Sequence, residues 1–333
     1  MWLASGGKWH GIARLDLFFL EDGQIRACEM NSDTPSGQPE TVSLNSLLAK
    51  HFPGLDNPNL GFEGAFLDTF ERHHQLETGQ DATLDGMRVG IVYPSELPED
   101  LSMIRLYSNW LSARGAAVVL GSPYNLKYKR SRKQLMLMGL PVDAIIRHYK
   151  TDWWSERISV WDDCDFADSE PLTEYLLDTL TAVEDRSASV FNPFGAVITQ
   201  NKLTLSFFFD HNELFSGQAQ ETIHKYLPEA HSLMRFVPEV DCRADWVLKS
   251  DYGCEGDEVV IGRNASEEIW QKTLELAKHE HWIAQRYFES VRIDGYEPNF
   301  GIYVLGGIPN GVFTRLAPKS TDYHSICIPT YVK

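Results

Sequence analysis

One segment limits the possible folds more than any other: residues 14–31, in which Asp22 and Gly23 separate two runs rich in β-forming side chains. An Asp-Gly pair between two such runs predicts a β-hairpin with a two-residue loop. In this register the residue numbers of cross-strand partners add up to 45. The hairpin therefore determines which side chains of the two strands share a face.

Four polar side chains come together at the open end of this hairpin. The register places Asp16 opposite Glu29. It places Arg14 opposite Asn31, and the period of two puts all four on one face. Cross-strand Cβ atoms are about 5 Å apart, so Asp16, Glu29 and Asn31 can share a hard cation such as Mg²⁺ through oxygen ligands. The spacing alone also fits an exposed charged hairpin.

Apolar and turn-forming residues surround this cluster. Nearer the turn, the period of two places four apolar side chains on the same face, namely Phe18, Leu20, Ile25 and Ala27. After Asn31 the chain continues with turn formers and hydroxyl residues instead of more strand. This continuation favours a binding site over an exposed hairpin.

Length and charge narrow the class of protein. A chain of 333 residues is long for one core and fits two or three lobes packed around a site. The 47 acidic and 30 basic residues give a net charge of −17, which argues against a nucleic-acid surface. The five cysteines are scattered without a C-x-x-C pair, so neither a zinc site nor a disulfide framework is indicated. Without a membrane-spanning run or a signal-peptide pattern, we expect a cytoplasmic protein that binds no membrane.

Strand and helix patterns alternate between residues 86 and 150. A buried-strand run, an amphipathic helix that ends at Gly115 and a second strand run predict a βαβ unit, and a further strand follows Pro141. We therefore expect a small Rossmann-like lobe with a parallel sheet. The lobe contains no G-x-G-x-x-G, so a dinucleotide site is not expected. Helical spacing predicts further helices at 40–50, 61–76, 172–183 and 267–279.

A glycine loop between two strand patterns lies at 245–262 and contains Gly253 and Gly256. Strands that flank such a loop form a flap whose backbone N–H groups can approach phosphates, and Lys249 would bring a charge beneath it. The loop is not a Walker A loop, because G-x-x-x-x-G-K-[S/T] is absent and a strand follows. A solvated lysine on a glycine hairpin has the same pattern.

Three more candidate residues lie elsewhere in the chain. Lys202 directly precedes an apolar run, and a surface lysine at a helix start is the default interpretation. Gln285 lies in a predicted strand at 281–290. Arg315 lies near the end of a predicted hairpin at 299–320.

In chain order these pieces resemble the synthetase domain of the glutathionylspermidine synthase family, which is similar to an ATP-grasp ligase with circularly permuted segments. The resemblance rests on RLD and CEMNSDTP in the hairpin, NK at 201–202, VLK with the glycine loop, IAQRYFE and TRLAPKS. It implies an α+β or α/β class, with a permuted ATP-grasp-like fold and an inserted Rossmann-like βαβ lobe. The expected domains are an N-terminal part of the ATP-grasp core with the metal-binding hairpin (1–80), the Rossmann-like pre-ATP-grasp or substrate lobe (81–160) and the nucleotide-binding lobes (161–333).

The resemblance also implies a role for each candidate residue. The metal ligands for Mg²⁺ would be Asp16, Glu29 and Asn31. The catalytic residues beside the transferred phosphoryl group would be Arg14 and Arg315. The residues that bind ATP would be Lys202, Lys249, Gly253, Gly256 and Gln285.

The implied activity is that of an ATP-dependent carboxylate–amine ligase, which forms an amide through an acyl phosphate. Its substrates would be a carboxylate such as a thiol peptide and an amine such as a polyamine. A protonated amine must lose a proton before it attacks, and Asp33 and Glu40 are candidate acceptors. Only thirteen residues precede Arg14, so an N-terminal segment is missing or the domain is minimal, and without a papain-like Cys/His domain we expect no amidase activity.

Three alternatives stay open. The chain could be a peptide or amino-acid ligase with other substrates. It could also be a nucleotide-binding protein without turnover, because the glycine loop contains an acid, Glu255, that could oppose phosphate binding. The third is that each motif is a solvated hairpin without a ligand. The oligomeric state is open as well.

Overall fold

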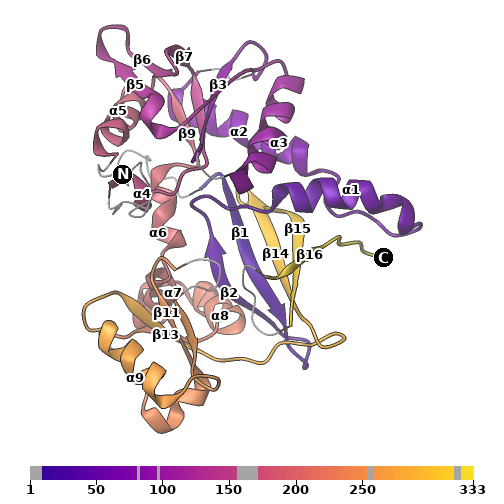
Figure 1. The fold of residues 1–333 in the computed structure, drawn as a ribbon, viewed down its shortest axis with the longest axis vertical. Helices are drawn as coiled ribbons and strands as arrows, with labels where there is room; N and C mark the ends of the chain where they lie inside the picture. The colour runs from indigo at the N-terminus through magenta and orange to yellow at the C-terminus, as the bar shows by residue number, and fades with distance from the viewer. Residues whose placement is uncertain (1–9, 81–82, 96–97, 156–171, 254–257, 319–323) are drawn as a thin grey trace.

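Four β-sheets organise the part of the chain that the computed structural model describes, which is residues 10–80, 83–95, 98–155, 172–253, 258–318 and 324–333. Figure 1 shows three regions: a central sheet, a lobe above it in this view and a smaller lobe below it. Among the described helices, none combines the length and the apolar character needed to cross a membrane.

The central sheet joins segments from both ends of the chain. Its order is β16-β15-β14-β1-β2, and all neighbours are antiparallel. The strands are β1 (Ile12–Phe19), β2 (Ile25–Asn31), β14 (Glu297–Leu305), β15 (Ile308–Ala317) and β16 (Ile326–Ile328). Because β1 pairs with β2 on one side and β14 on the other, the side chains of β1 lie between the first hairpin and the predicted C-terminal hairpin, which is present as β14 and β15.

The register of the β1–β2 hairpin matches the prediction only at its open end. Arg14 pairs with Asn31 and Asp16 with Glu29, as expected, but a bulge then shifts the register. Ala27 consequently pairs with Leu17 and lies on the opposite face from the one predicted.

The two-residue loop was also wrong, because the loop contains five residues, 20–24. Gly23 has φ +80°, and its N–H donates to the carbonyl of Leu20 while the N–H of Leu20 donates to Gln24. Gly23 thus supplies a positive φ that this wider turn requires.

A parallel sheet forms the centre of the upper lobe, in the order β4-β3-β8-β9. Its strands are β3 (Arg88–Val92), β4 (Ala117–Gly121), β8 (Ala144–Arg147) and β9 (Ser189–Phe191). The helices of this lobe are α2 (Phe62–Thr78), α3 (Leu101–Ala113), α4 (Asp152–Ser155) and α5 (Thr173–Glu184). Phe62, Phe66 and Phe70 repeat every four residues along α2, so they share one face and pack in the core with β3 and α3. The strands and the helix predicted between residues 86 and 150 are present as β3, α3, β4 and β8.

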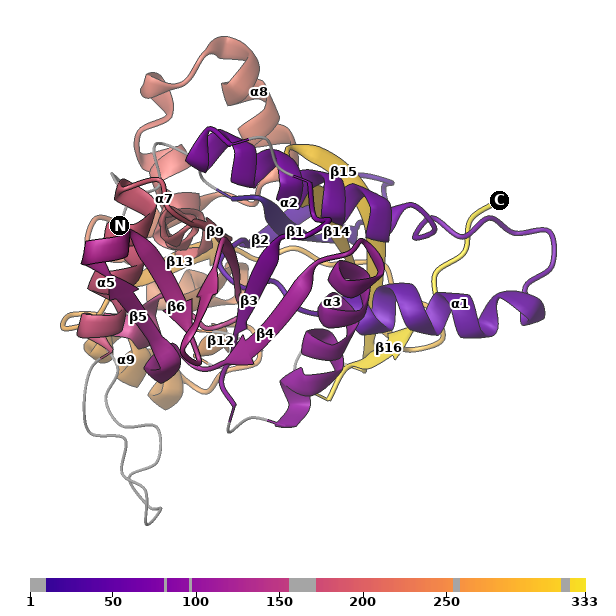
Figure 2. The same ribbon diagram turned by 90° about the horizontal axis from the view of Figure 1, so that it is seen from above.

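An antiparallel three-stranded sheet within this lobe was not predicted. Its strands are β5 (Leu126–Lys129), β6 (Gln134–Leu137) and β7 (Leu140–Val142). Figure 2 shows β5, β6 and α5 on one flank of the parallel sheet and α3 on the other. Strands of three or four residues give too short an alternation to be recognised in the sequence.

The lower lobe contains a four-stranded antiparallel sheet in the order β10-β13-β11-β12. Its strands are β10 (Ala230–Ser232), β11 (Trp246–Ser250), β12 (Val259–Ile261) and β13 (Trp282–Arg286). The helices are α6 (Val197–Gln200), α7 (Leu203–Asp210), α8 (Gly217–Tyr226) and α9 (Glu267–Leu276). The helix predicted at 40–50 consists of a π-helical turn (Pro39–Leu44), α1 (Asn45–Leu48) and a 3-10 turn (Ala49–His51).

Two buried polar contacts attach the upper lobe to the hairpin. The side chain of Asn192 accepts hydrogen bonds from the N–H groups of Gly11 and Ile12 and donates to the carbonyls of Ile12 and Ser32, at 2.7–2.9 Å. At the end of β8, the Arg147 guanidinium lies 2.6 Å from the carboxylate of Asp33. Both contacts position the turn that follows the predicted metal ligands.

Candidate functional site

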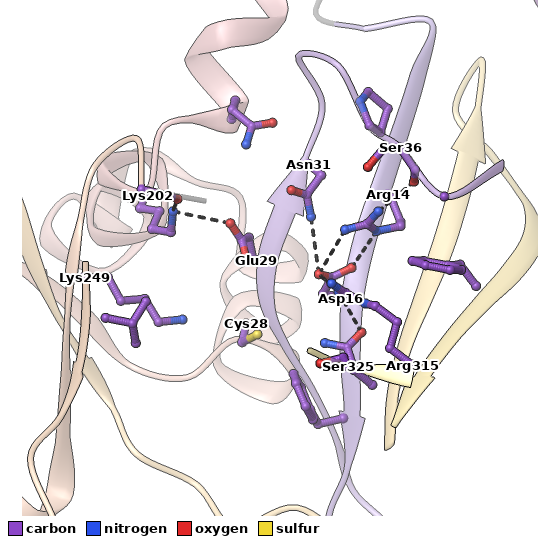
Figure 3. Close-up of a pocket in the computed structure, with 18 of the residues that line it drawn as sticks. Arg14, Asp16, Cys28, Glu29, Asn31, Ser36, Lys202, Lys249, Arg315 and Ser325 are labelled. Atoms are coloured by element: carbon purple, nitrogen blue, oxygen red, sulfur yellow. Dashed lines mark hydrogen bonds and ion pairs between the residues drawn. The ribbon is translucent and has the colours of Figure 1, made fainter. Parts of the chain in front are cut away.

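A cavity of about 1430 Å³ lies where the central sheet meets the two lobes (Figure 3). Nine of the ten candidate residues line it, namely Arg14, Asp16, Glu29, Asn31, Lys202, Lys249, Gly253, Gln285 and Arg315. The tenth, Gly256, lies outside the described residues, as does Glu255. The fold thus brings side chains from both ends of the chain to one space.

Asp16 is the centre of a buried charge cluster at this cavity. Arg14 Nε donates to its Oδ1 at 2.8 Å, and Arg315 Nη2 donates to its Oδ2 at 2.7 Å. Burial alone would raise the pKa of Asp16, but the two guanidinium groups outweigh burial and hold that pKa below its usual range. Asp16 is therefore a carboxylate that orients two arginines.

Arg14 is held from three sides. Its Nη1 donates to the carbonyl of Ser36 at 2.7 Å, and its guanidinium lies over the ring of Phe313 at 5.4 Å. Gly301, beside it on β14, leaves room for the side chain, since a Cβ there would lie 2.6 Å from Arg14 Cδ. Although burial opposes it, Asp16 raises the pKa of Arg14, which therefore stays charged.

The bulge in β2 brings a residue to the cavity that sequence reasoning missed. Cys28 and Glu29 are consecutive, yet both line the cavity, because the bulge interrupts the alternation of the strand. Burial raises the pKa of the Cys28 thiol to about 12. At neutral pH the thiol is protonated and poorly nucleophilic.

Lys202 is buried, so the default interpretation of a surface lysine was wrong. It lies directly before α7, and 4% of its side chain is exposed. Its Nζ lies 3.3 Å from Glu29 Oε1 and donates to the carbonyl of Gly253. Figure 3 shows the contact with Glu29, and the contact with Gly253 connects the lysine to the beginning of the glycine loop.

Lys249 and Gln285 face the cavity from adjacent strands of the lower sheet. Val247 pairs with Gln285 across β11 and β13, and Lys249 lies two residues further along β11 on the same face. Gln285 Nε2 donates to the carbonyl of Cys28 at 3.4 Å. A cation and an amide therefore share this wall with apolar side chains, among them Val247 and Ile261.

The family model described as glutathionylspermidine synthase preATP-grasp matches residues 4–333. The chain belongs to this family. It is a family of ATP-dependent amide ligases related to the ATP-grasp enzymes, and the match agrees with the resemblance seen in the sequence. None of the curated proteins compared with the chain matches it.

Two solved structures share the mixed α/β fold. A glutathione synthetase-like effector from Globodera pallida has a TM-score of 0.61 at 12% identity, over 99% of this chain and 79% of the effector chain. A putative gamma-glutamylcysteine synthetase from Methylobacillus flagellatus has a TM-score of 0.53 at 11% identity, over 97% and 80%. At these identities the similarity concerns the fold alone.

Two of the three predicted metal ligands, Glu29 and Asn31, offer an oxygen to a hard cation, whereas both oxygens of Asp16 accept hydrogen bonds from arginines. Asn31 uses its Nδ2 to donate to Asp16 at 3.4 Å, so its amide oxygen is available as a ligand. Glu29 has one oxygen at Lys202 and a second for which the described residues provide no hydrogen bond. Among the described residues, no group of three His, Cys, Asp or Glu side chains is placed to hold a metal ion. The assignment of Mg²⁺ stays a prediction.

The structure separates the two candidate proton acceptors. Asp33 cannot act as one, because Arg147, Thr151 Oγ1 and the N–H of Thr151 donate to its two oxygens at 2.6–2.7 Å. Glu40 lines the cavity, and none of the described residues forms a hydrogen bond or ion pair with it. Asp152, which sequence reasoning did not single out, also lines the cavity, and burial raises its pKa.

Gly301→Ala should lower the free energy of unfolding by about 1–3 kcal/mol, because the new methyl group displaces the Arg14 side chain in a closely packed place. Urea unfolding measures the change. Gly64→Ala is the matched control, since a Cβ there meets nothing within 4 Å. Equal effects of the two substitutions would contradict the close contact with Arg14.

Asp16→Asn should make stability less sensitive to acid. The folded pKa of Asp16 lies below the unfolded value, so its charge stabilises the fold above the unfolded pKa of about 4, and this contribution is lost as the pH falls through the folded pKa. We expect the free energy of unfolding of the wild type to exceed that of the variant by about 2 kcal/mol near neutral pH. This difference should disappear in acid. Urea unfolding between about pH 7 and pH 2.5 tests this, and a gap independent of pH would refute it.

Proposed function

We propose that the chain is an ATP-dependent carboxylate–amine ligase that forms an amide through an acyl phosphate. The proposal includes the permuted ATP-grasp fold with its inserted Rossmann-like lobe and the domain boundaries near residues 80 and 160. The names of the two similar structures, a glutathione synthetase-like protein and a gamma-glutamylcysteine synthetase, make a thiol peptide the first carboxylate to test.

The observation that carries this proposal is the unsatisfied state of Arg315. Its Nη2 donates to Asp16, but its Nε is buried and has no hydrogen-bond partner among the described residues. A buried donor without a partner costs about 1–3 kcal/mol, which an anionic ligand in the cavity would remove. Lys249, on the facing wall, also has no hydrogen bond or ion pair within the described part of the chain. The two cations suit a phosphate-containing ligand.

The first step transfers a phosphoryl group. An oxygen of the substrate carboxylate attacks the γ-phosphorus of ATP, the bond to ADP breaks, and an acyl phosphate results. Arg14 and Arg315 would donate hydrogen bonds to the oxygens on which charge develops, and Lys249 would bind phosphates. Held by Asp16, Glu29 and Asn31, Mg²⁺ would neutralise charge on the phosphate oxygens.

In the second step an amine attacks the acyl carbon, phosphate leaves with the bonding electrons, and the new amide nitrogen gives up one proton. Glu40 or Asp152 would accept a proton, because both carboxylates line the cavity. The raised pKa of Asp152 brings that group closer to neutrality, where a general base works best.

Mass spectrometry of products tests the proposal. The protein is incubated with ATP, Mg²⁺ and pairs drawn from thiol peptides, amino acids and polyamines. Formation of ADP and of an amide that requires both substrates supports the ligase, and the product mass distinguishes a polyamine ligase from a peptide ligase. ATP binding without turnover would support a nucleotide-binding protein instead.

A further inference from the structure

Two residues expected to bind different partners contact each other in this structure. Glu29 is a predicted metal ligand and Lys202 a predicted ATP-binding residue, whose ammonium group suits a phosphate, yet Glu29 Oε1 lies 3.3 Å from Lys202 Nζ. The lysine is almost fully buried, whereas 24% of the Glu29 side chain is exposed. Their charges therefore neutralise each other within the cavity before any ligand enters.

This pairing is specific to one of the two lysines. In the described part of the chain, Lys249 forms neither a hydrogen bond nor an ion pair, so its ammonium group is available to a phosphate. Glu29 offsets the charge of Lys202, so that charge is fully available to a phosphate only if Glu29 moves away. Asp16, the other predicted carboxylate ligand, is neutralised by two arginines instead.

We propose that the Glu29–Lys202 ion pair makes ATP binding depend on the divalent cation. The inference rests on the proposed function. A metal that takes the Glu29 carboxylate releases Lys202 for a phosphate, and a phosphate that takes Lys202 releases Glu29 for the metal. Each ligand therefore removes a competitor of the other, and by thermodynamic linkage the two effects are equal.

The second contact of Lys202 keeps it in place during this exchange. Its Nζ also donates to the carbonyl of Gly253, at the described start of the glycine loop. A backbone carbonyl carries no net charge, so it positions the ammonium group without cancelling the charge that a phosphate requires. The loss of Glu29 thus leaves an oriented cation, whose side chain does not have to be ordered again on binding.

The first test is ATP affinity measured by calorimetry in EDTA and in Mg²⁺. Glu29→Gln should tighten metal-free ATP binding by at least about fivefold, the lower end of usual coupling factors, and should reduce the enhancement by Mg²⁺. Glu40→Gln is the matched control, because it removes a carboxylate of the same cavity that has no partner among the described residues. An equal gain in both variants would mean a general charge effect and overturn the proposal.

A second set of variants, made in protein that lacks the Lys202 ammonium group, distinguishes the effect of the ion pair from the effect of removing one negative charge. In Lys202→Met protein, Glu29→Gln should give no more gain than Glu40→Gln, because no lysine is left to release. If Glu29→Gln still tightened metal-free ATP binding fully in Lys202→Met protein, the proposed coupling would be wrong.

The reciprocal test titrates Mg²⁺ alone. Lys202→Met should tighten Mg²⁺ binding more than Lys249→Met, which removes the same charge without freeing Glu29. Circular dichroism establishes that each variant is folded. If the wild type binds no ATP even with Mg²⁺, the proposed function itself is wrong; if it binds ATP and the Glu29 variant matches its control, only the coupling is wrong.

Discussion

Arg315→Ala should lower kcat by about 100-fold or more and leave the ATP dissociation constant nearly unchanged. Arg315 holds Asp16 in the cavity, and its buried Nε has no hydrogen-bond partner among the described residues. In the proposed mechanism its interaction is strongest when charge develops on the transferred phosphoryl group, and only such interactions raise kcat. Single-turnover rates and ATP affinities of the wild type and the variant measure the two effects separately.

Two further variants interpret this result. Arg315→Lys should recover only part of the rate, because a point charge cannot replace a guanidinium that would have to contact Asp16 and a phosphoryl group at once. Arg292→Ala is a matched loss of charge at the same cavity, where the guanidinium donates to the carbonyls of Gly295 and Pro318, and it should change kcat little. If Arg315→Ala turned over at the wild-type rate, Arg315 would be only a partner that holds Asp16.

The open end of the hairpin could be predicted because its register depends on local alternation. Arg14, Asp16, Glu29 and Asn31 lie as the sequence indicated. The bulge could not be predicted, since nothing in the alternation around Cys28 distinguishes a regular strand from one with an extra residue. The bulge matters for the site, because it adds the thiol to the cavity wall and turns Ala27 to the other face.

The burial of Lys202 could not be predicted from the local sequence pattern. A lysine before an apolar helix is usually exposed, and only the approach of β2 and the glycine loop, far away in the chain, makes this one buried. The resemblance to a known family placed Lys202 among the candidate residues, and it does line the cavity. Its contact with Glu29 became visible only in the structure. Contacts between distant segments are therefore what the sequence could not provide.

The role of Asp33 also depends on distant segments of the chain. The sequence suggested a proton acceptor, but the carboxylate is buried against the guanidinium of Arg147, of whose side chain 0% is exposed. Asp33→Ala removes the carboxylate paired with that buried cation and leaves it backbone carbonyls, among them those of Tyr149 and Asn192, so we expect the free energy of unfolding to fall by about 3–5 kcal/mol. Asp68→Ala, which breaks an exposed pair with Arg114, should cost less than about 1 kcal/mol.

A double variant decides whether the loss comes from the stranded charge. Arg147→Met in the Asp33→Ala background removes the unpaired cation, so it should restore part of the lost stability, as measured by urea unfolding. The opposite result, a folded Asp33→Ala protein of nearly normal stability whose amide formation has lost its dependence on a basic group, would return Asp33 to the mechanism as the proton acceptor. If Asp33 has only a structural role, the pH dependence of amide formation belongs to Glu40 or Asp152, two further carboxylates that line the cavity.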